Sequence, residues 1–189
     1  MTKWTIVLAG LTTLSLFALH GALFLGLRTT GEMRERAIRL AQILSWPTLA
    51  IAGGFAVWTQ LAHGNGWTWV AVVVAALGLL GAVRAAAQQR ELAGFAFTSV
   101  VIVAAVVLIF GSLFPDVMPS STAPAYSLTV DNASSTHYTL VVMTWVAVVL
   151  TPVVLLYQGF TYWVFRRRLG VADIPAGSGL TRAVRSAVR

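Results

Sequence analysis

Five long apolar runs, separated by short polar segments, organise the chain. Each run is close to or longer than the roughly 20 residues that an α-helix needs to cross a hydrocarbon core of about 30 Å. The runs contain continuous Ala, Val and Leu, whereas membrane β-strands show alternating segments of about ten residues. They lie at about residues 4–27, 40–62, 67–87, 94–114 and 138–165. The pattern predicts an all-α polytopic transmembrane helix bundle of about five helices within residues 1–169, followed by a basic tail at 170–189.

Composition supports lipid as part of the solvent. Hydrophobic residues make up 58% of the 189 positions and charged residues only 10%, compared with roughly 25% charged residues in soluble domains. So few charges could not cover a water-facing surface of this size. The chain also has no cysteine, which excludes disulfides and thiolate ligands for metals.

The net charge of +7 is concentrated beside the apolar runs. Segments 28–39, 84–91 and 166–189 hold twelve of the thirteen basic residues, and segments 63–66 and 115–137 hold none. No basic stripe interleaved with aromatic residues occurs in a soluble segment, so the pattern does not favour a nucleic-acid partner. The positive-inside rule predicts an N-terminus outside and a C-terminus in the cytoplasm of a multi-pass membrane protein.

His20 lies well inside the first apolar run, whereas all six Asp and Glu residues fall in loops or at predicted helix ends. It could be a haem ligand, a proton relay or a buried hydrogen-bonding group. Without a second intramembrane histidine or a carboxylate in the helices, we expect a structural or interface role. No metalloprotease or Ser-His-Asp spacing is present, and we predict no catalytic, cofactor-binding or metal-binding residue on this chain.

Two amides and two prolines interrupt the apolar runs. Gln60 and Gln158 could line a quinone or water path, but we expect them to form interhelical hydrogen bonds, because an amide in hydrocarbon needs a partner. Pro152 lies centrally in the last run and predicts a bend there, while Pro47 is expected near the start of its helix.

The outer segment 115–137 is rich in Pro, Ser, Asp and Asn. Asp131, Asn132 and Ser134 are candidates for side-chain hydrogen bonds to neighbouring backbone groups. A structural interpretation is an ordered turn that caps the helix starting near Tyr138.

The same segment resembles a known family. Residues 113–121 (LFPDVMPSS), 127–135 (SLTVDNASS) and 139–143 closely resemble the last outer loop of subunit II of cytochrome bd-type quinol oxidases. Residues 21–25 (GALFL) with Arg28, Thr29, Gly31 and Glu32 are similar to a middle helix of that family and the loop after it. Residues 157–166 (YQGFTYWVFR) are similar to the close of its last helix. The resemblance corresponds to helices four to eight of an eight-helix pattern, with the first three absent.

The resemblance implies a respiratory complex in the bacterial cytoplasmic (inner) membrane that oxidises quinol and reduces oxygen to water. It implies that this chain is the non-haem subunit II, which binds no cofactor itself and packs against and stabilises a haem-bearing subunit I carrying haem b and haem d. The expected partners are therefore subunit I, in a heterodimer, membrane lipid, and the quinone pool through the complex.

Two other functions remain open at the level of the residues. A small membrane transporter would use kinked helices and membrane amides as a path, but it predicts charged groups at mid-membrane. A structural membrane adaptor would use the basic tail to bind lipid or a soluble partner.

Overall fold

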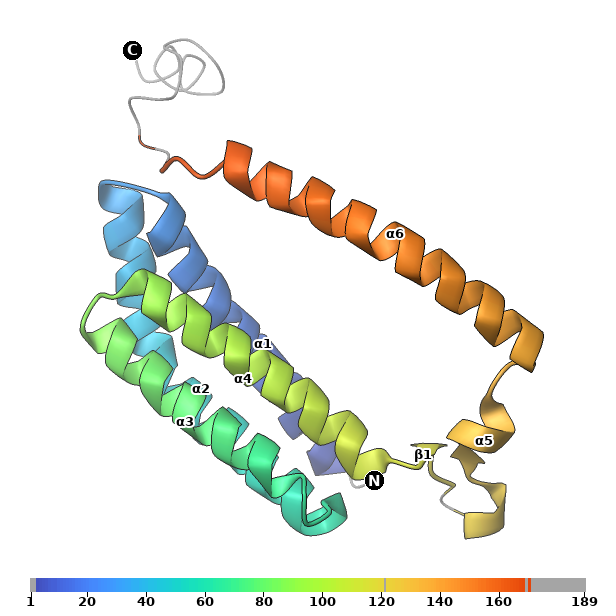
Figure 1. The fold of residues 1–189 in the computed structure, drawn as a ribbon. Coiled ribbons are helices and arrows are strands. Elements are labelled where there is room, and N and C mark those ends of the chain that lie inside the picture. The colour runs from blue at the N-terminus through green and yellow to red at the C-terminus, as the bar shows by residue number, and fades with distance from the viewer. Residues whose placement is uncertain (1–2, 121, 169, 171–189) are drawn as a thin grey trace, which may run out of the picture.

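The computed structural model describes residues 3–120, 122–168 and 170. Most of this chain is helical (Figure 1), and five helices are long and apolar enough to cross a membrane. They are α1 (Lys3–Arg28), α2 (Glu32–His63), α3 (Trp69–Ala87), α4 (Glu91–Leu113) and α6 (His137–Val164). The prediction of an all-α polytopic bundle with about five spans is confirmed. Apart from Gly170, the predicted tail at 170–189 lies outside the described residues.

Helices α1 to α4 pack together as one bundle (Figure 1). One layer of its core takes a residue from each helix: Leu16, Ala52, Leu79 and Val101, each at most 5% exposed. Small residues line much of the rest, because helices in lipid gain attraction mainly from close van der Waals contact. Gly78 shows how close the approach is, since a Cβ added there would lie 2.7 Å from Cγ2 of Val101 on α4.

Helix α2 begins before its apolar run. Glu32 and Glu35 lie in its first turn, where carboxylates interact favourably with the positive end of the helix dipole. Gly31 precedes it with φ of 66°, a left-handed conformation that glycine adopts without steric cost. Because the helix begins at Glu32, Pro47 lies in its interior, and the expectation that Pro47 is near a helix start was wrong.

The segment between α4 and α6 is an ordered loop. Strand β1 (Asp116–Met118) pairs antiparallel with β2 (Leu128–Thr129), and the 3-10 helix η1 (Pro124–Tyr126) lies between them. The short helix α5 (Val130–Ala133) follows β2. The backbone N–H of Val130 donates to the carbonyl of Pro115 at 3.0 Å, which closes the loop on itself.

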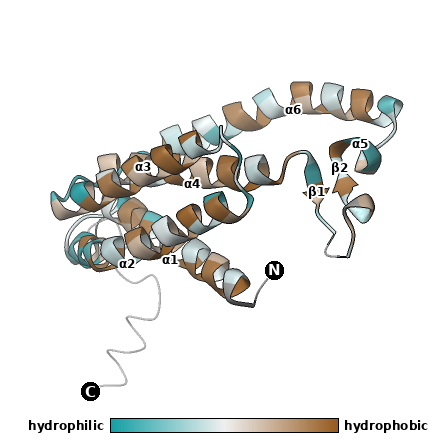
Figure 2. Ribbon diagram, turned by 90° about the horizontal axis from the view of Figure 1, so that it is seen from below, coloured by the Kyte–Doolittle hydropathy of each residue, from teal (hydrophilic) through white to brown (hydrophobic). Residues whose placement is uncertain are grey.

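Helix α6 stands apart from the bundle over most of its length (Figure 1). No residue of α6 is buried, whereas 44% of the residues in the most apolar 18-residue stretch of α3 are buried. Hydrophobic positions are distributed along α6 as they are along the bundle helices (Figure 2). The chain therefore contains four helices that cover one another and a fifth that its own described residues leave uncovered.

Candidate functional site

His20 joins α1 to α4. Its Nδ1 lies 2.7 Å from Oγ1 of Thr98, and its ring stacks on Phe95 with centroids 4.4 Å apart. The Thr98 hydroxyl is fully buried and lies 3.0 Å from the carbonyls of Gly94 and Phe95. A hydroxyl has one proton, so donation to either carbonyl leaves the oxygen to accept from Nδ1–H of His20. This arrangement suits an interhelical hydrogen bond.

Neither of the other two histidines lies beside His20. The Phe95 ring covers one face of the imidazole, Nδ1 is engaged with Thr98, and Nε2 is the remaining ring nitrogen. His63 ends α2 and His137 begins α6, so neither lies at the depth of His20 to supply a second axial ligand. Within residues 3–120, 122–168 and 170, no cluster of three or more His, Cys, Asp or Glu side chains is placed to hold a metal ion.

Gln60 belongs to a hydrogen-bonded turn between α2 and α3. The side chain is 4% exposed, its Oε1 accepts from Thr68 Oγ1 at 2.8 Å, and its Nε2 donates to the carbonyl of Asn65 at 2.9 Å. Asn65 in turn donates from Nδ2 to the carbonyl of Gly111 on α4 at 3.3 Å. Gln60 thereby fixes one end of the bundle through its own turn, and both ends of its amide have partners.

Gln158 and Pro152 lie on the exposed helix α6. Pro152 is inside the helix, which continues through it without a break. Gln158 lines a groove of about 360 Å³ between the ends of α1 and α6. Other residues lining this groove are Phe24, Arg28, Thr161, Tyr162, Phe165 and Arg167. Since the Gln158 amide forms no hydrogen bond with a described residue, it remains available to a lipid head group or a partner subunit.

Asn132 and Ser134 form side-chain hydrogen bonds in the loop after β2, whereas Asp131 contributes its backbone carbonyl. Asn132 accepts from the backbone N–H of Thr129 at 2.7 Å through Oδ1, and its own N–H donates to Thr129 Oγ1 at 3.2 Å. The Ser134 hydroxyl donates to the carbonyl of Asp131 at 3.3 Å. The resulting capping box belongs to α5. The expectation that this turn caps the helix near Tyr138 was wrong, because Thr136 precedes α6 without a side-chain cap.

Sequence reasoning missed the polar contacts at the basic end of the bundle. Arg34 of α2 forms an ion pair with Glu91 of α4, and the two side chains are 33% and 10% exposed. Arg28, the last residue of α1, donates from Nη1 to the carbonyl of Phe165 at 3.2 Å. Opposite charges in loops predicted on the same membrane side were the available signal for the ion pair. No comparable signal identifies a bond to a backbone carbonyl.

Comparison with known proteins gives the family. The sequence profile described as cytochrome bd terminal oxidase subunit II matches residues 1–165. The chain belongs to this family. The match extends through α6, so the exposed helix is part of the family pattern, and the resemblance stated from the sequence is confirmed.

Curated relatives of this subunit II chain have consistent names. The chain is 33% identical over 203 residues to cytochrome bd-I ubiquinol oxidase subunit 2 of Escherichia coli K12, and the match covers 89% of this chain and 53% of the relative. It is 37% identical over 169 residues to cytochrome bd ubiquinol oxidase subunit 2 of Bacillus subtilis 168, covering 86% of this chain and 50% of the relative. The chain thus spans about half the length of the curated relatives that it matches.

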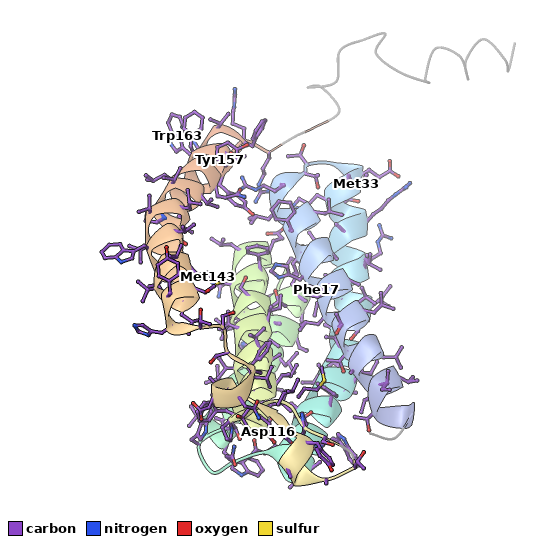
Figure 3. The ribbon with its side chains drawn as sticks, turned by 90° about the vertical axis from the view of Figure 1, so that its right-hand side faces the viewer. Phe17, Met33, Asp116, Met143, Tyr157 and Trp163 are labelled. Carbon is purple, nitrogen blue, oxygen red and sulfur yellow. The ribbon has the colours of Figure 1, made fainter. Side chains whose placement is uncertain are left out.

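Helix α6 presents an exposed surface along its length. Figure 3 shows Met143, Tyr157 and Trp163 on this helix, which stands apart from α1 and its residue Phe17. Met143, Tyr157 and Trp163 are each 59% exposed or more. We call the side chains of residues 137–164 the α6 surface. Large apolar and aromatic groups on an uncovered helix make this surface a candidate interface with lipid or another membrane subunit.

Proposed function

We propose that this chain contributes the non-haem subunit II of a cytochrome bd-type terminal oxidase, a complex that oxidises quinol and reduces oxygen to water. In this proposal haem b and haem d belong to subunit I, and the chain packs against that subunit and stabilises it. The family match over residues 1–165 supports the proposal, as do relatives named as ubiquinol oxidase subunits in two bacteria. Both observations favour an oxidase over a transporter or an adaptor.

The structural support for the proposed contact with subunit I comes from the α6 surface. Helices α1 to α4 bury residues against one another, whereas α6 buries none. The lipid chains are as apolar as leucine, so hydropathy alone does not require a protein partner. A helix that belongs to the family pattern and is not packed by its own chain is, however, well placed to contact a second subunit along its length.

We further propose the bacterial cytoplasmic membrane as the location, with the N-terminus outside and the C-terminus in the cytoplasm. The contacts Arg34 to Glu91 and Arg28 to Phe165 bring the basic turns and the end of α6 to one end of the molecule. The loop between α4 and α6, which lacks Lys and Arg, follows the opposite end of α4. This separation of charge supports the orientation given by the positive-inside rule.

Purification of the full chain with its co-purifying subunits tests the proposed function. The expected preparation contains a second membrane subunit, shows haem b and haem d absorbance, and consumes oxygen when quinol is added. Recovery of the chain as a haem-free homo-oligomer would overturn the proposal.

A matched pair of variants tests the role of the α6 surface within that preparation. Leu155 on α6 and Leu77 on α3 are both 64% exposed. If α6 faces the partner, Leu155→Ala destabilises the haem-bearing complex by about 1–3 kcal/mol, which lowers its melting temperature. Leu77→Ala is then expected to leave the melting temperature unchanged. A Leu155→Ala effect no larger than that of Leu77→Ala would contradict a partner-facing role for α6.

A further inference from the structure

A groove of about 560 Å³ runs between α2 and α3 on the outside of the bundle. Its lining comes from two helical stripes, one on each helix, in which residues three and four apart share a face. Ser45 and Trp46 line it from α2, and Leu80, Val83, Arg84 and Ala87 line it from α3. The stripe from Leu80 to Ala87 covers about two helical turns, or roughly 10 Å of groove.

The groove changes from apolar to polar along its length. Trp46 and Leu80 are 66% and 54% exposed and form its apolar part. Arg84 and Gln88 lie towards the C-terminal end of α3. Gln42 also lines the groove, and its Nε2 donates to the carbonyl of Ala86 at 3.2 Å, which bridges the two helices. The surface therefore suits a molecule with an apolar body and a polar end.

Arg84 is a cation without a partner among the described residues. The two ion pairs of the described chain use Arg34 with Glu91 and Arg36 with Glu32, and the Arg84 guanidinium forms no hydrogen bond with a described residue. A neighbouring hollow of about 350 Å³ also includes Gln42, and Arg34, Glu35 and Arg39 are among the residues that line it. The polar end of the groove therefore has a positive balance of charge.

We propose that this groove binds an anionic glycerophospholipid from the leaflet next to the basic turns. Its phosphate contacts the guanidinium of Arg84, which presents paired N–H donors that match phosphate oxygens. An acyl chain lies against Trp46, Leu80 and Val83. Charge complementarity selects an anionic head group over a zwitterionic one, since each cation near the membrane surface favours anionic lipid. The apolar wall favours a lipid over free phosphate, which would leave Trp46 and Leu80 without a contact.

The test uses the purified full chain in nanodiscs made of phosphatidylglycerol and phosphatidylcholine, released into a native mass spectrometer. The wild type is expected to retain phosphatidylglycerol in preference to phosphatidylcholine. Arg84→Gln is expected to lower retained phosphatidylglycerol about fivefold, the effect of one cation near the membrane surface, and Arg84→Lys to keep most of it. Arg36→Gln removes the same charge from an exposed position and is expected to change retention little.

A second pair of variants tests the apolar wall. Trp46→Ala is expected to lower lipid retention, whereas Trp58→Ala, on the same helix but outside this groove, leaves it unchanged. Helical content by circular dichroism confirms that each variant is folded, and added inorganic phosphate is expected not to displace the lipid. Equal losses for Arg84→Gln and Arg36→Gln, equal retention of the two lipids, or displacement by phosphate would each overturn the proposal.

Discussion

Arg28 and Phe165 connect the bundle to the far end of α6. The guanidinium at the end of α1 donates from Nη1 to the carbonyl of the residue that follows α6, at 3.2 Å and across 137 positions of sequence. At the opposite end of α6, the loop that follows α4 connects the helix to the bundle. Helix α6 is thus held at both ends, and none of its residues between them is buried.

Substitution of Arg28 by Gln is expected to loosen this end of α6. The lost hydrogen bond is exposed, so its contribution is about 1 kcal/mol or less. Because the chain has no cysteine, single cysteines introduced on α1 and α6 would carry spin labels specifically. The distance distribution between the labels is expected to broaden in Arg28→Gln and to remain unchanged in Arg167→Gln. An unchanged distribution in both variants would contradict a role for Arg28 in holding α6.

Gly78 is expected to tolerate no side chain. In Gly78→Ala the new Cβ would lie 2.7 Å from Val101 Cγ2 and 3.3 Å from the Phe97 carbonyl, so α3 and α4 have to separate, at a cost of about 1–3 kcal/mol. Gly54→Ala is the control, because no atom lies within 4 Å of its added Cβ. Thermal unfolding in detergent is expected to shift down for Gly78→Ala only. Equal melting temperatures would show that the α3–α4 contact can adjust.

Thr98→Val removes the hydroxyl that His20 contacts. Hydrogen bonds between membrane helices contribute about 0.6 kcal/mol on average and up to about 1.7 kcal/mol, and a loss in this range is expected. A double-mutant cycle with His20→Phe measures the coupling, and the exposed Thr144→Val on α6 serves as the matched control. Additive effects of the two substitutions would show that His20 and Thr98 contribute independently.

Glu91→Gln is expected to weaken the contact between α2 and α4. Since Glu91 is only 10% exposed and Arg34 is 33% exposed, loss of the carboxylate leaves a partly buried cation and costs about 1–3 kcal/mol. Glu32→Gln breaks an exposed pair within one helix and is expected to cost less than about 0.5 kcal/mol. Chemical denaturation in mixed micelles compares the two, and a Glu91→Gln effect no larger than that of Glu32→Gln would refute the argument.

The helices could be predicted from the sequence because each apolar run has the length that the bilayer requires. The start of α2 at Glu32 could not, because polar helical turns beyond the hydrocarbon core leave no apolar signal. The separation of α6 from the bundle also could not be predicted from the sequence. A lipid-facing helix and a partner-facing helix have similar hydropathy, and only burial distinguishes α6 from α3.

The polar side chains were only partly predictable. An amide in an apolar run has to find a partner, but the sequence did not show that Gln60 turns back to Asn65 and Thr68 in the adjoining turn. Asn132 was recognised as a residue that bonds local backbone, and its position in a capping box for α5 depends on Thr129 three residues earlier. In both cases residue chemistry predicted that a bond forms, and the path of the backbone determined which bond.

The attachment of α6 at its two ends has a kinetic consequence. A subunit that docks along residues 137–164 has no buried side chain of α6 to uncover first, and the bundle of α1 to α4 can remain packed throughout. Association of such preformed surfaces proceeds as rigid-body docking. The rate of joining is then set by lateral diffusion and encounter within the bilayer, and a slow refolding phase in assembly would have to arise in the partner.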